Sequence, residues 1–369
     1  MEEMETNIPQ GSWVMVTGAT GFVGSHVAKA FLERGFRVRG TVRDLDRASW
    51  LTNDVMKKYA DRGDFELAHV PDLAADGAFD EAIKGISAIA HVASILTFDP
   101  DPNNVIPRTV TGATSVLHAA MRESSVKAFV YTSSIGAVTM PRPGNVTPIT
   151  WDTYNDFATR ASWAPPPYEP SRGMLTYMAS KVAAEKAVWK FVEERKPHFT
   201  INSIPPSAIM GQALNKAHNE GIGAWVRNLY DGDTSFWGPH GASKLISVLD
   251  RQPKVMPSDP DGSYADYGVD VKDVAVLHVA AVLDPSVNHA RLQAWGHKCN
   301  GNDILAIMRK HYPQHAFVDD LANQTVLGFS ADFTIPLALL KKWAGQDGWK
   351  PLEVTVVENV ESILKLNKD

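Results

Sequence analysis

A tyrosine and a lysine stand four residues apart in the segment Tyr177-Met178-Ala179-Ser180-Lys181. On a helix this spacing places the phenol and the ammonium group on one face. A neighbouring cation favours the phenolate, so we expect Lys181 to draw the pKa of Tyr177 down toward neutral pH, where a phenol can transfer protons. The same spacing also arises when a surface lysine lies beside a packed ring, so the pair needs support from elsewhere in the chain.

A pair of serines provides that support. Ser133 and Ser134 follow the apolar run 128–132, which predicts a buried strand. Ligands of parallel sheets bind outside the carboxyl ends of the strands, and a hydroxyl there can donate to a carbonyl oxygen that gains negative charge. These residue types predict proton transfer to a carbonyl group, with a serine of this pair and Tyr177 at one edge of a sheet.

Three glycines form a second chemical feature. Gly18, Gly21 and Gly24 directly follow the apolar run 13–17 and open a helix-like stretch. Such glycines permit a tight turn, close approach of the backbone to a pyrophosphate, and close packing of helix on strand. The spacing G-x-x-G-x-x-G differs from the general dinucleotide fingerprint G-x-G-x-x-G and lacks the Lys-Ser/Thr ending of a triphosphate-binding loop. We interpret it as a dinucleotide site; the alternative is a glycine-rich turn that binds nothing.

The end of the second predicted strand bears on which dinucleotide is bound. Arg43 follows the run 36–42, and an arginine at this place accommodates the 2′-phosphate of NADP, whereas a carboxylate pairs with the ribose hydroxyl of NAD. Arg39 and Arg47 add positive charge nearby. NADPH is therefore the predicted cofactor. If the strand ended one residue later, Asp44 would take this position and Arg43 would be an ordinary surface arginine.

These residues require a scaffold of alternating strands and helices. Apolar runs predict the strands, and longer helix-like stretches predict the helices between them. The predicted strands are residues 13–17, 36–42, 65–69, 88–93, 128–132 and 199–204, and the helices include 23–34, 112–121 and 175–194. This order predicts an α/β fold of the Rossmann type, a doubly wound parallel sheet with helices on both faces.

The regular alternation ends near Pro205. Turn-rich stretches follow at 231–241 and 253–267, with predicted helices at 222–230, 271–283, 302–312 and 351–364. We expect residues 1–205 to form mainly the NADP-binding domain. Residues 206–369 are expected to form mainly a smaller C-terminal substrate-binding lobe, with some segments returning to the first domain.

Composition and charge argue against several other classes of protein. The chain has 36 basic and 42 acidic residues and a net charge of -6, which offers no general field for nucleic acid. It shows neither a signal-like start nor an apolar run of about 18 residues, so no membrane association is expected. The single cysteine, Cys299, favours a reducing compartment, with the cytoplasm as the default. The 12 histidines show no paired ligand spacing, so no metal site is expected.

With these residues in view, the chain resembles an extended short-chain dehydrogenase/reductase near the dihydroflavonol-reductase-like group. Within that group it is most similar to fungal NADPH-dependent aldehyde and ketone reductases. The matching segments are Val16 to Gly24, Val38 to Arg43, Asp72-Leu73, His91 to Ser94, Tyr131 to Ser134, Tyr177 to Lys181, and Pro205-Pro206 with Gly211. They are spread over most of the chain, and together they are highly specific.

The resemblance implies a role for each matching residue. Ser134 would polarise the substrate carbonyl, with Ser133 as the alternative; Tyr177 would donate the proton; and Lys181 would also hold the nicotinamide ribose. Asp72 and Leu73 would flank the adenine, Ala93 and Ser94 would line the nicotinamide ribose, and Pro206 would lie by the carboxamide. The implied cofactor-binding set is Gly18, Thr20, Gly21, Phe22, Val23, Gly24, Arg43, Asp72, Leu73, Ala93, Ser94, Tyr177, Lys181 and Pro206.

The predicted activity is NADPH-dependent reduction of aldehydes and ketones by a monomer or homodimer acting on a small carbonyl compound. Phe98, Leu175 and Trp225 stand where relatives line an apolar substrate pocket, although core packing explains each of them equally well. Two alternatives stay open. One is a nucleotide-sugar epimerase or dehydratase of the same fold, and the other is a protein that binds the cofactor without turnover.

Overall fold

The computed structural model describes residues 5–140, 146, 148–220, 224–234, 265–322 and 324–367. The two stretches predicted as turn-rich, 231–241 and 253–267, lie largely outside these residues. The first residues of the helix predicted at 222–230 also lie outside them.

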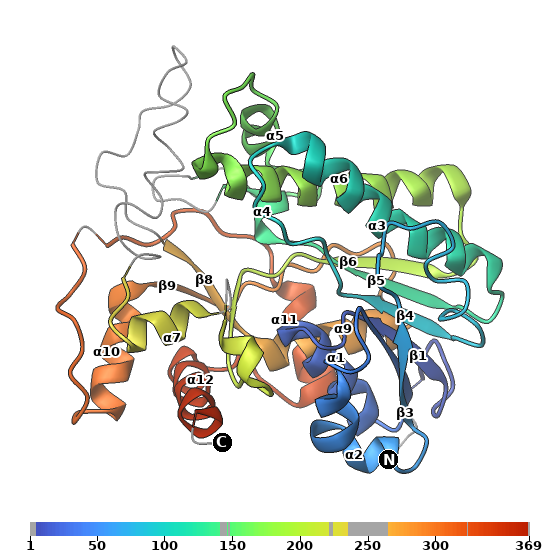
Figure 1. Ribbon diagram of the computed structural model, residues 1–369, viewed down its shortest axis with the longest axis horizontal. Coiled ribbons are helices and arrows are strands. Elements are labelled where there is room, and N and C mark those ends of the chain that lie inside the picture. The colour runs from blue at the N-terminus through green and yellow to red at the C-terminus, as the bar shows by residue number, and fades with distance from the viewer. Residues whose placement is uncertain are drawn as a thin grey trace.

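A six-stranded parallel sheet forms the centre of the molecule, with strand order β3-β2-β1-β4-β5-β6 (Figure 1). Its strands are β1 (Trp13–Thr17), β2 (Arg37–Val42), β3 (Phe65–His69), β4 (Ala88–His91), β5 (Ala128–Thr132) and β6 (Thr200–Ile204). The chain proceeds outward from β1 in one direction and then from β4 in the other. The predicted doubly wound fold is therefore confirmed, and the switch point that binds ligands in such sheets lies between β1 and β4.

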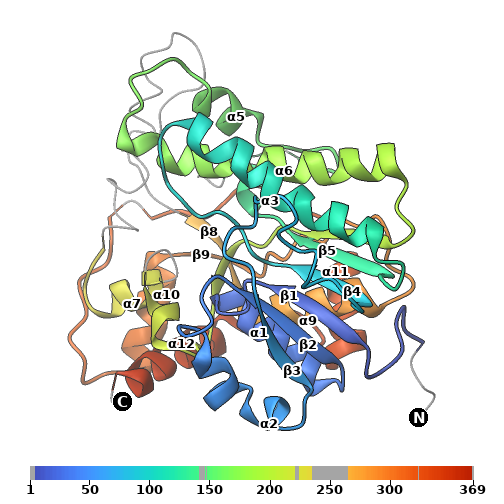
Figure 2. The ribbon, with the colours of Figure 1, turned by 45° about the vertical axis from the view of Figure 1, so that its right-hand side comes forward.

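Helices cover both faces of this sheet, as two views of the ribbon show (Figures 1 and 2). On one face lie α3 (Pro102–Arg122) and α6 (Gly173–Arg195), which pack against each other; on the other lie α1 (Phe22–Glu33), α9 (Val271–Leu283) and α11 (Thr334–Ala344). The predicted helix at 271–283 is confirmed, and the Asp270 side chain caps it by accepting from the Lys272 amide. Because α9 packs on α1, part of the chain beyond Pro205 belongs structurally to the main sheet.

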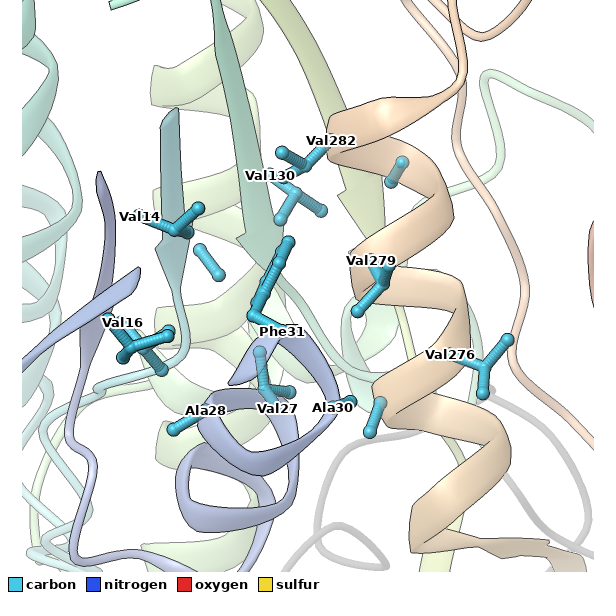
Figure 3. Close-up of a cluster of buried hydrophobic side chains, with 14 of the residues drawn as sticks. Val14, Val16, Val27, Ala28, Ala30, Phe31, Val130, Val276, Val279 and Val282 are labelled. Carbon is cyan, nitrogen blue, oxygen red and sulfur yellow. The ribbon is translucent and has the colours of Figure 1, made fainter. Parts of the chain in front are cut away.

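The apolar core between α1, α9 and the strands holds this layer together. Figure 3 shows side chains from both helices pointing toward those of the sheet. Labelled there are Val14, Val16, Val27, Ala28, Ala30, Phe31, Val130, Val276, Val279 and Val282. Phe31 has no exposed surface, and burying a side chain of this size contributes about 1.5–3 kcal/mol. This core fixes α1, and with it the glycine loop at its start.

Helix α3 is about twice as long as predicted, because it begins at Pro102 and not at residue 112. Acidic residues and prolines before it are also typical of turns, but Asp101 is the N-cap and accepts from the Asn103 amide. Pro102 occupies the first turn, where its missing amide proton costs nothing. The same residues that break a helix in its interior start one here.

The C-terminal lobe contains a second sheet that the sequence analysis did not predict. Its order is β7-β8-β9, with β7 (Ala208–Met210) parallel to β8 (Ala265–Asp270) and β8 antiparallel to β9 (His297–Asn300). These strands are short, and β9 reads His-Lys-Cys-Asn, so neither length nor periodicity marks them. Around them lie α7 (Trp225–Tyr230), α10 (Gly301–His311) and α12 (Leu352–Leu366) (Figure 1).

Several short elements complete the described chain. Two of them, α4 (Ile135–Val138) and α5 (Asp156–Ser162), lie near the carboxyl end of β5. The others are η1 (Leu51–Val55), α2 (Lys57–Ala60), η2 (Pro170–Arg172) and η3 (Lys216–Asn219).

Candidate active site

The end of β5 faces helix α6, and this contact assembles the predicted catalytic residues. Ser134 is hydrogen-bonded to Tyr177 through its side chain. One helical turn further along α6, the Lys181 ammonium group donates to the Thr132 carbonyl oxygen at 2.8 Å. The structure therefore brings Ser134, Tyr177 and Lys181 together at the carboxyl end of the sheet, the edge where ligands of this fold class bind.

The pKa of Tyr177 differs from the expectation. Burial raises this pKa above its ordinary value, and the hydrogen bond from Ser134 only partly lowers it again. Lys181 was expected to lower it, but its ammonium group is directed at Thr132 and at the Tyr131 hydroxyl, 3.1 Å away. The prediction of a phenol near neutral pKa was therefore wrong for this state of the protein. A half-buried phenol that stays protonated at neutral pH is suited to donate a proton.

Lys181 is almost fully buried, with 2% of its surface exposed. Burial lowers its pKa to about 8, and the carboxylate of Glu185 opposes this by favouring the charged form. The ammonium group is charged at neutral pH and is held by two oxygens, the Thr132 carbonyl and the Tyr131 hydroxyl. The sequence analysis did not identify Tyr131 as part of the site, although its position next to the end of a central strand could have indicated it.

The two serines have different surroundings. Ser133 is buried and donates to the carboxylate of Glu185 at 2.9 Å, so its hydroxyl is directed away from Tyr177. Ser134 is partly exposed, caps α4 by accepting from the Gly136 amide, and keeps its own proton for Tyr177 or a ligand. Of the two serines, the geometry favours Ser134 as the residue that acts on a carbonyl group.

Replacing each serine separately tests this assignment. Ser134→Ala is expected to lower kcat by about a hundredfold, because removing one donor to a developing oxyanion costs about 2.7–4 kcal/mol. Ser133→Ala should cost less than about tenfold, because Ser133 acts only through its neighbours. Steady-state kinetics on both variants measure the difference. A larger loss in Ser133→Ala would reverse the assignment.

The glycine loop is built for close backbone contacts. Gly18 has a φ of 67°, and a Cβ there would lie 3.1 Å from Ala93, so the loop packs directly on the end of β4. A Cβ on Gly24 would lie 2.2 Å from the Gly18 carbonyl oxygen, which excludes any side chain. Gly21 is the N-cap of α1, so the amides of Phe22 and Val23 lie in the first turn. A helix N-terminus next to a loop without side chains is suited to a pyrophosphate.

A threonine and a histidine hold Ala93 against this loop. The Thr17 hydroxyl accepts from the amides of Val92 and Ala93, both at 3.0 Å, so its proton is left to donate to His91 Nδ1 at 2.9 Å. Burial lowers the pKa of His91 to about 3, and the ring is neutral with its proton on Nε2. Leu73, Ala93 and Ser94 line one small cavity together with His91 and Tyr131.

The remaining contacts of the glycine loop come from β2 and the C-terminal lobe. A Cβ on Gly40 would lie 2.7 Å from the Cβ of Ala19, so Gly40 lets the loop approach β2. The carbonyl oxygen of Thr20 accepts from His218 Nε2 at 3.0 Å. Neither Gly40 nor His218 was singled out from the sequence, because each acts by contact with a distant segment.

Arg43 lies just beyond the end of β2 and is exposed. Among the described residues its guanidinium group has no hydrogen-bond or ion-pair partner, so it is available to a ligand. Asp44 instead accepts from the amide of Arg47 and stabilises its own turn. Arg39 was expected to add charge here, but it pairs with Glu66 and donates to two carbonyl oxygens, so that expectation was wrong.

Two further residues of the implied cofactor set make structural contacts. Asp72 accepts from the Ala74 amide and pairs with Arg108 at 3.0 Å, so its carboxylate already has local partners. The carbonyl oxygen of Pro206 accepts from the Ile135 amide at 2.8 Å, which places Pro206 beside Ser134.

The three residues expected in a substrate pocket have different environments. The ring of Phe98 lies beside that of Tyr177, with centroids 5.4 Å apart. Leu175 has no exposed surface and packs against α5, and Trp225 is 5% exposed in the core of the lobe. Only Phe98 is placed to touch a ligand at Tyr177. For Leu175 and Trp225 the structure supports the core-packing alternative, because both side chains are enclosed by apolar neighbours.

Among the residues that the structure describes, neither a metal site nor a membrane-spanning helix is present. No group of three or more histidine, cysteine, aspartate or glutamate side chains is arranged to hold a metal ion. Within the same residues, each helix is too short or too polar to cross a bilayer.

Comparison with known proteins identifies the family. The model of the NAD dependent epimerase/dehydratase family matches residues 14–292. An NAD-dependent epimerase/dehydratase from Aspergillus terreus is 35% identical over 357 residues, covering 96% of this chain and 98% of that protein. Aldehyde reductase 2 from Sporidiobolus salmonicolor is 33% identical over 358 residues, covering 96% and 97% of the two chains.

A solved structure shows the same fold. Yeast methylglyoxal/isovaleraldehyde reductase Gre2, crystallised with NADPH, aligns with a TM-score of 0.74 at 23% identity, covering 96% of this chain and 99% of that one. The chain belongs to the NAD dependent epimerase/dehydratase family, the extended short-chain dehydrogenases/reductases that its motifs resemble.

Proposed function

We propose that the protein reduces aldehydes and ketones to alcohols with NADPH. The observation that carries this proposal is the contact of Ser134 with Tyr177 beside the charged Lys181, at the ligand-binding edge of the sheet. The aldehyde reductase from Sporidiobolus salmonicolor, which aligns over nearly its whole length, supports the same reaction class.

The residues present fit a dinucleotide. Gly21 and Gly24 leave the start of α1 open to a pyrophosphate, and the exposed Arg43 is free to pair with a 2′-phosphate. Lys181 is assigned to the nicotinamide ribose by the family resemblance. When bound, the reduced nicotinamide supplies the hydride that the carbonyl carbon accepts.

The side chains supply the proton and the orientation. Ser134 donates a hydrogen bond to the carbonyl oxygen and stabilises the negative charge that develops there. Tyr177 gives its proton to the same oxygen, so one hydride and one proton convert the carbonyl to an alcohol. Ser134, whose hydrogen bond lowers the pKa of Tyr177, stabilises the phenolate that remains. Phe98 presents an apolar ring beside Tyr177, which favours a substrate with an aryl or bulky apolar group.

A panel of carbonyl compounds tests the proposal. The purified protein should oxidise NADPH with aromatic aldehydes and ketones, followed by the loss of nicotinamide absorbance, and should act more slowly with small polar aldehydes. No oxidation with any member of the panel, together with conversion of a nucleotide-sugar, would establish the epimerase or dehydratase alternative. Tight NADPH binding without any turnover would indicate a binding protein.

Arg43 determines the cofactor preference in this account. Arg43→Ala is expected to raise KM for NADPH by about 10- to 100-fold, because a hydrogen bond to a charged group contributes about 1.5–3 kcal/mol. The KM for NADH should stay nearly unchanged, since that cofactor lacks the 2′-phosphate. Arg39→Ala is the matched control on the same strand, because Arg39 is engaged with Glu66. Equal changes in KM for NADPH and NADH in Arg43→Ala would contradict the assignment. Asp44 would then be the residue expected to meet the cofactor ribose.

A further inference from the structure

We propose that Glu185 is a positioning residue for carbonyl reduction, which locks the strand end that carries Ser134 onto the helix that carries Tyr177 and Lys181. The inference rests on the proposed function, which it extends to a residue that touches neither substrate nor cofactor. Glu185 forms a buried ion pair with Arg291 that has no part in the mechanism proposed for the reaction.

The carboxylate of Glu185 has no exposed surface and accepts four hydrogen bonds. Ser133 of the β5 end donates to one oxygen at 2.9 Å, and Ser203 of β6 donates to the other at 2.8 Å. Arg291 donates to both oxygens, through Nε at 3.0 Å and Nη2 at 2.9 Å. A carboxylate bound in this bidentate way, with each oxygen doubly satisfied, is fixed in position and direction.

Arg291 is itself held from the other side. Its Nη1 donates to the carbonyl oxygens of residues 151 and 153, at 3.0 and 2.7 Å, and its guanidinium lies 4.4 Å from the ring centre of Tyr154. Next to that segment, Asn155 donates to the carbonyl oxygens of Gly136, inside the helix capped by Ser134, and of Thr139, at the end of that helix. The ion pair thus ties the surroundings of Ser134 together from two directions.

The contacts between the end of β5 and α6 come from one face of the helix. Along α6, Tyr177, Lys181 and Glu185 follow one another at intervals of four residues and so lie on one face. They meet Ser134, the Thr132 carbonyl oxygen and Ser133, three consecutive residues of one strand end. Of these contacts, the one at Glu185 is the fully buried one with the most hydrogen bonds. It therefore sets the register in which the two catalytic contacts form.

Glu185 also affects the charge on Lys181. The titratable groups that interact with the ammonium are Glu185 on its own helix, Tyr131 on β5 and the neutral His91 on β4. Of these, Glu185 is the one that raises the pKa of Lys181 against the effect of burial. Loss of the negative charge should therefore lower the pKa of Lys181 below its value of about 8.

A purely structural role is the alternative that the experiment has to separate. Removing one member of a buried ion pair commonly destabilises a protein, whereas replacing both members by apolar groups is often neutral or stabilising. We therefore compare Glu185→Gln with the double variant Glu185→Gln/Arg291→Met. Asp284→Asn is the control, because Asp284 is equally buried and accepts from Lys342 and Trp343 at the far end of α9.

The expected results concern rate and pH dependence as well as stability. Glu185→Gln and the double variant should each lower kcat about tenfold or more, since small misplacement of catalytic groups is costly. The alkaline limb of kcat, expected near pH 8 in the wild type, should move to lower pH in Glu185→Gln. The pH above which NADPH binding weakens, measured by tryptophan fluorescence, should move in the same direction. Asp284→Asn should unfold at a lower temperature than the wild type, but its kcat and the alkaline limb of its pH profile should be unchanged.

Either of two outcomes would overturn the proposal. One is a double variant that is as stable as the wild type and has wild-type kcat and pH dependence. The other is a loss of kcat in Asp284→Asn that matches its loss of stability and equals that of Glu185→Gln. Failure of the proposed function is distinguishable, because it would appear as a wild-type protein that reduces no carbonyl compound. The pH dependence of NADPH binding would then still decide whether Glu185 controls Lys181.

Discussion

Replacing Tyr177 by phenylalanine is expected to lower kcat for ketone reduction by about a hundredfold or more, with little change in NADPH affinity. The substitution removes only the hydroxyl, which is bonded to Ser134, and leaves the ring against Phe98. Neither water nor Ser134 can replace the Tyr177 hydroxyl efficiently as proton donor, because neither is an acid held in the same position. Single-turnover kinetics measure the chemical step, and fluorescence titration measures NADPH binding.

Tyr154→Phe is the matched control for this variant. Tyr154 lies near the site and its ring packs on Arg291, but within the described residues its hydroxyl has no hydrogen-bond partner. It should therefore retain nearly full activity. Near-normal turnover in Tyr177→Phe would remove Tyr177 from the chemistry.

Replacing Lys181 by methionine should lower kcat/KM by about a hundredfold or more while leaving the fold intact. Lys181 is 2% exposed and its pKa is lowered to about 8, so burial already disfavours the cation. Methionine fills a similar volume without a charge, so we expect little loss of stability. Activity falls because the group assigned to the nicotinamide ribose is gone, so the nicotinamide is no longer held in position beside Tyr177. Thermal unfolding measures any loss of stability, and steady-state kinetics measure the loss of activity, so the two can be compared directly.

Lys186→Met serves as the control on the same helix. Lys186 is exposed and contacts Asp156 and the ring of Tyr154. It does not lie on the face of α6 that carries Tyr177, Lys181 and Glu185. Its loss should change kcat/KM less than about twofold, as for most surface charges. An active Lys181→Met variant, with NADPH affinity also unchanged, would show that the buried ammonium group is only a structural element.

The pH profile follows from the same two residues. Tyr177 has a raised pKa and stays protonated at neutral pH, while Lys181 loses its proton as the pH rises through about 8. Since the charged form of Lys181 is the better hydrogen-bond donor to the nicotinamide ribose that it is assigned to hold, reduction should decline above about pH 8. A profile that rises through this range would contradict the assigned protonation states.

Local sequence patterns were sufficient to predict the central sheet and the residues at its ligand edge. The β-branched runs that became β1 and β5, and the glycines that exclude a Cβ between α1 and β4, are properties of neighbouring residues. The spacing of Tyr177 and Lys181 on a helix was likewise local. These features fix the class of site before any long-range contact is known.

The rest depended on contacts between residues far apart in the chain. Glu185 and Arg291 are separated by 106 positions, and nothing local to either indicates a pair. Leu175 lies close to Tyr177 in sequence, but it points into a different cluster, against α5. The pKa of Tyr177 was predicted with the wrong sign because burial, which a sequence does not show, raises it, while the Lys181 ammonium is directed at Thr132 and Tyr131.

Short and polar elements form the other group of differences. The strands of the second sheet are three to six residues long and gain their stability from α10 and α12, not from their own pattern. Helix α3 starts ten residues early because Asp101 and Pro102 cap it, a use that acidic and proline residues share with turns.

The most direct test of the account is to follow a deuterium label from the cofactor into the product. With NADPH deuterated on the transferred position and an aromatic ketone, mass spectrometry should find one deuterium on the carbinol carbon of the alcohol. Under the same conditions Tyr177→Phe should form the same labelled alcohol, but about a hundredfold more slowly or not measurably. An unlabelled product, or a nucleotide-sugar that is epimerised without net consumption of NADPH, would contradict carbonyl reduction as the function of this protein.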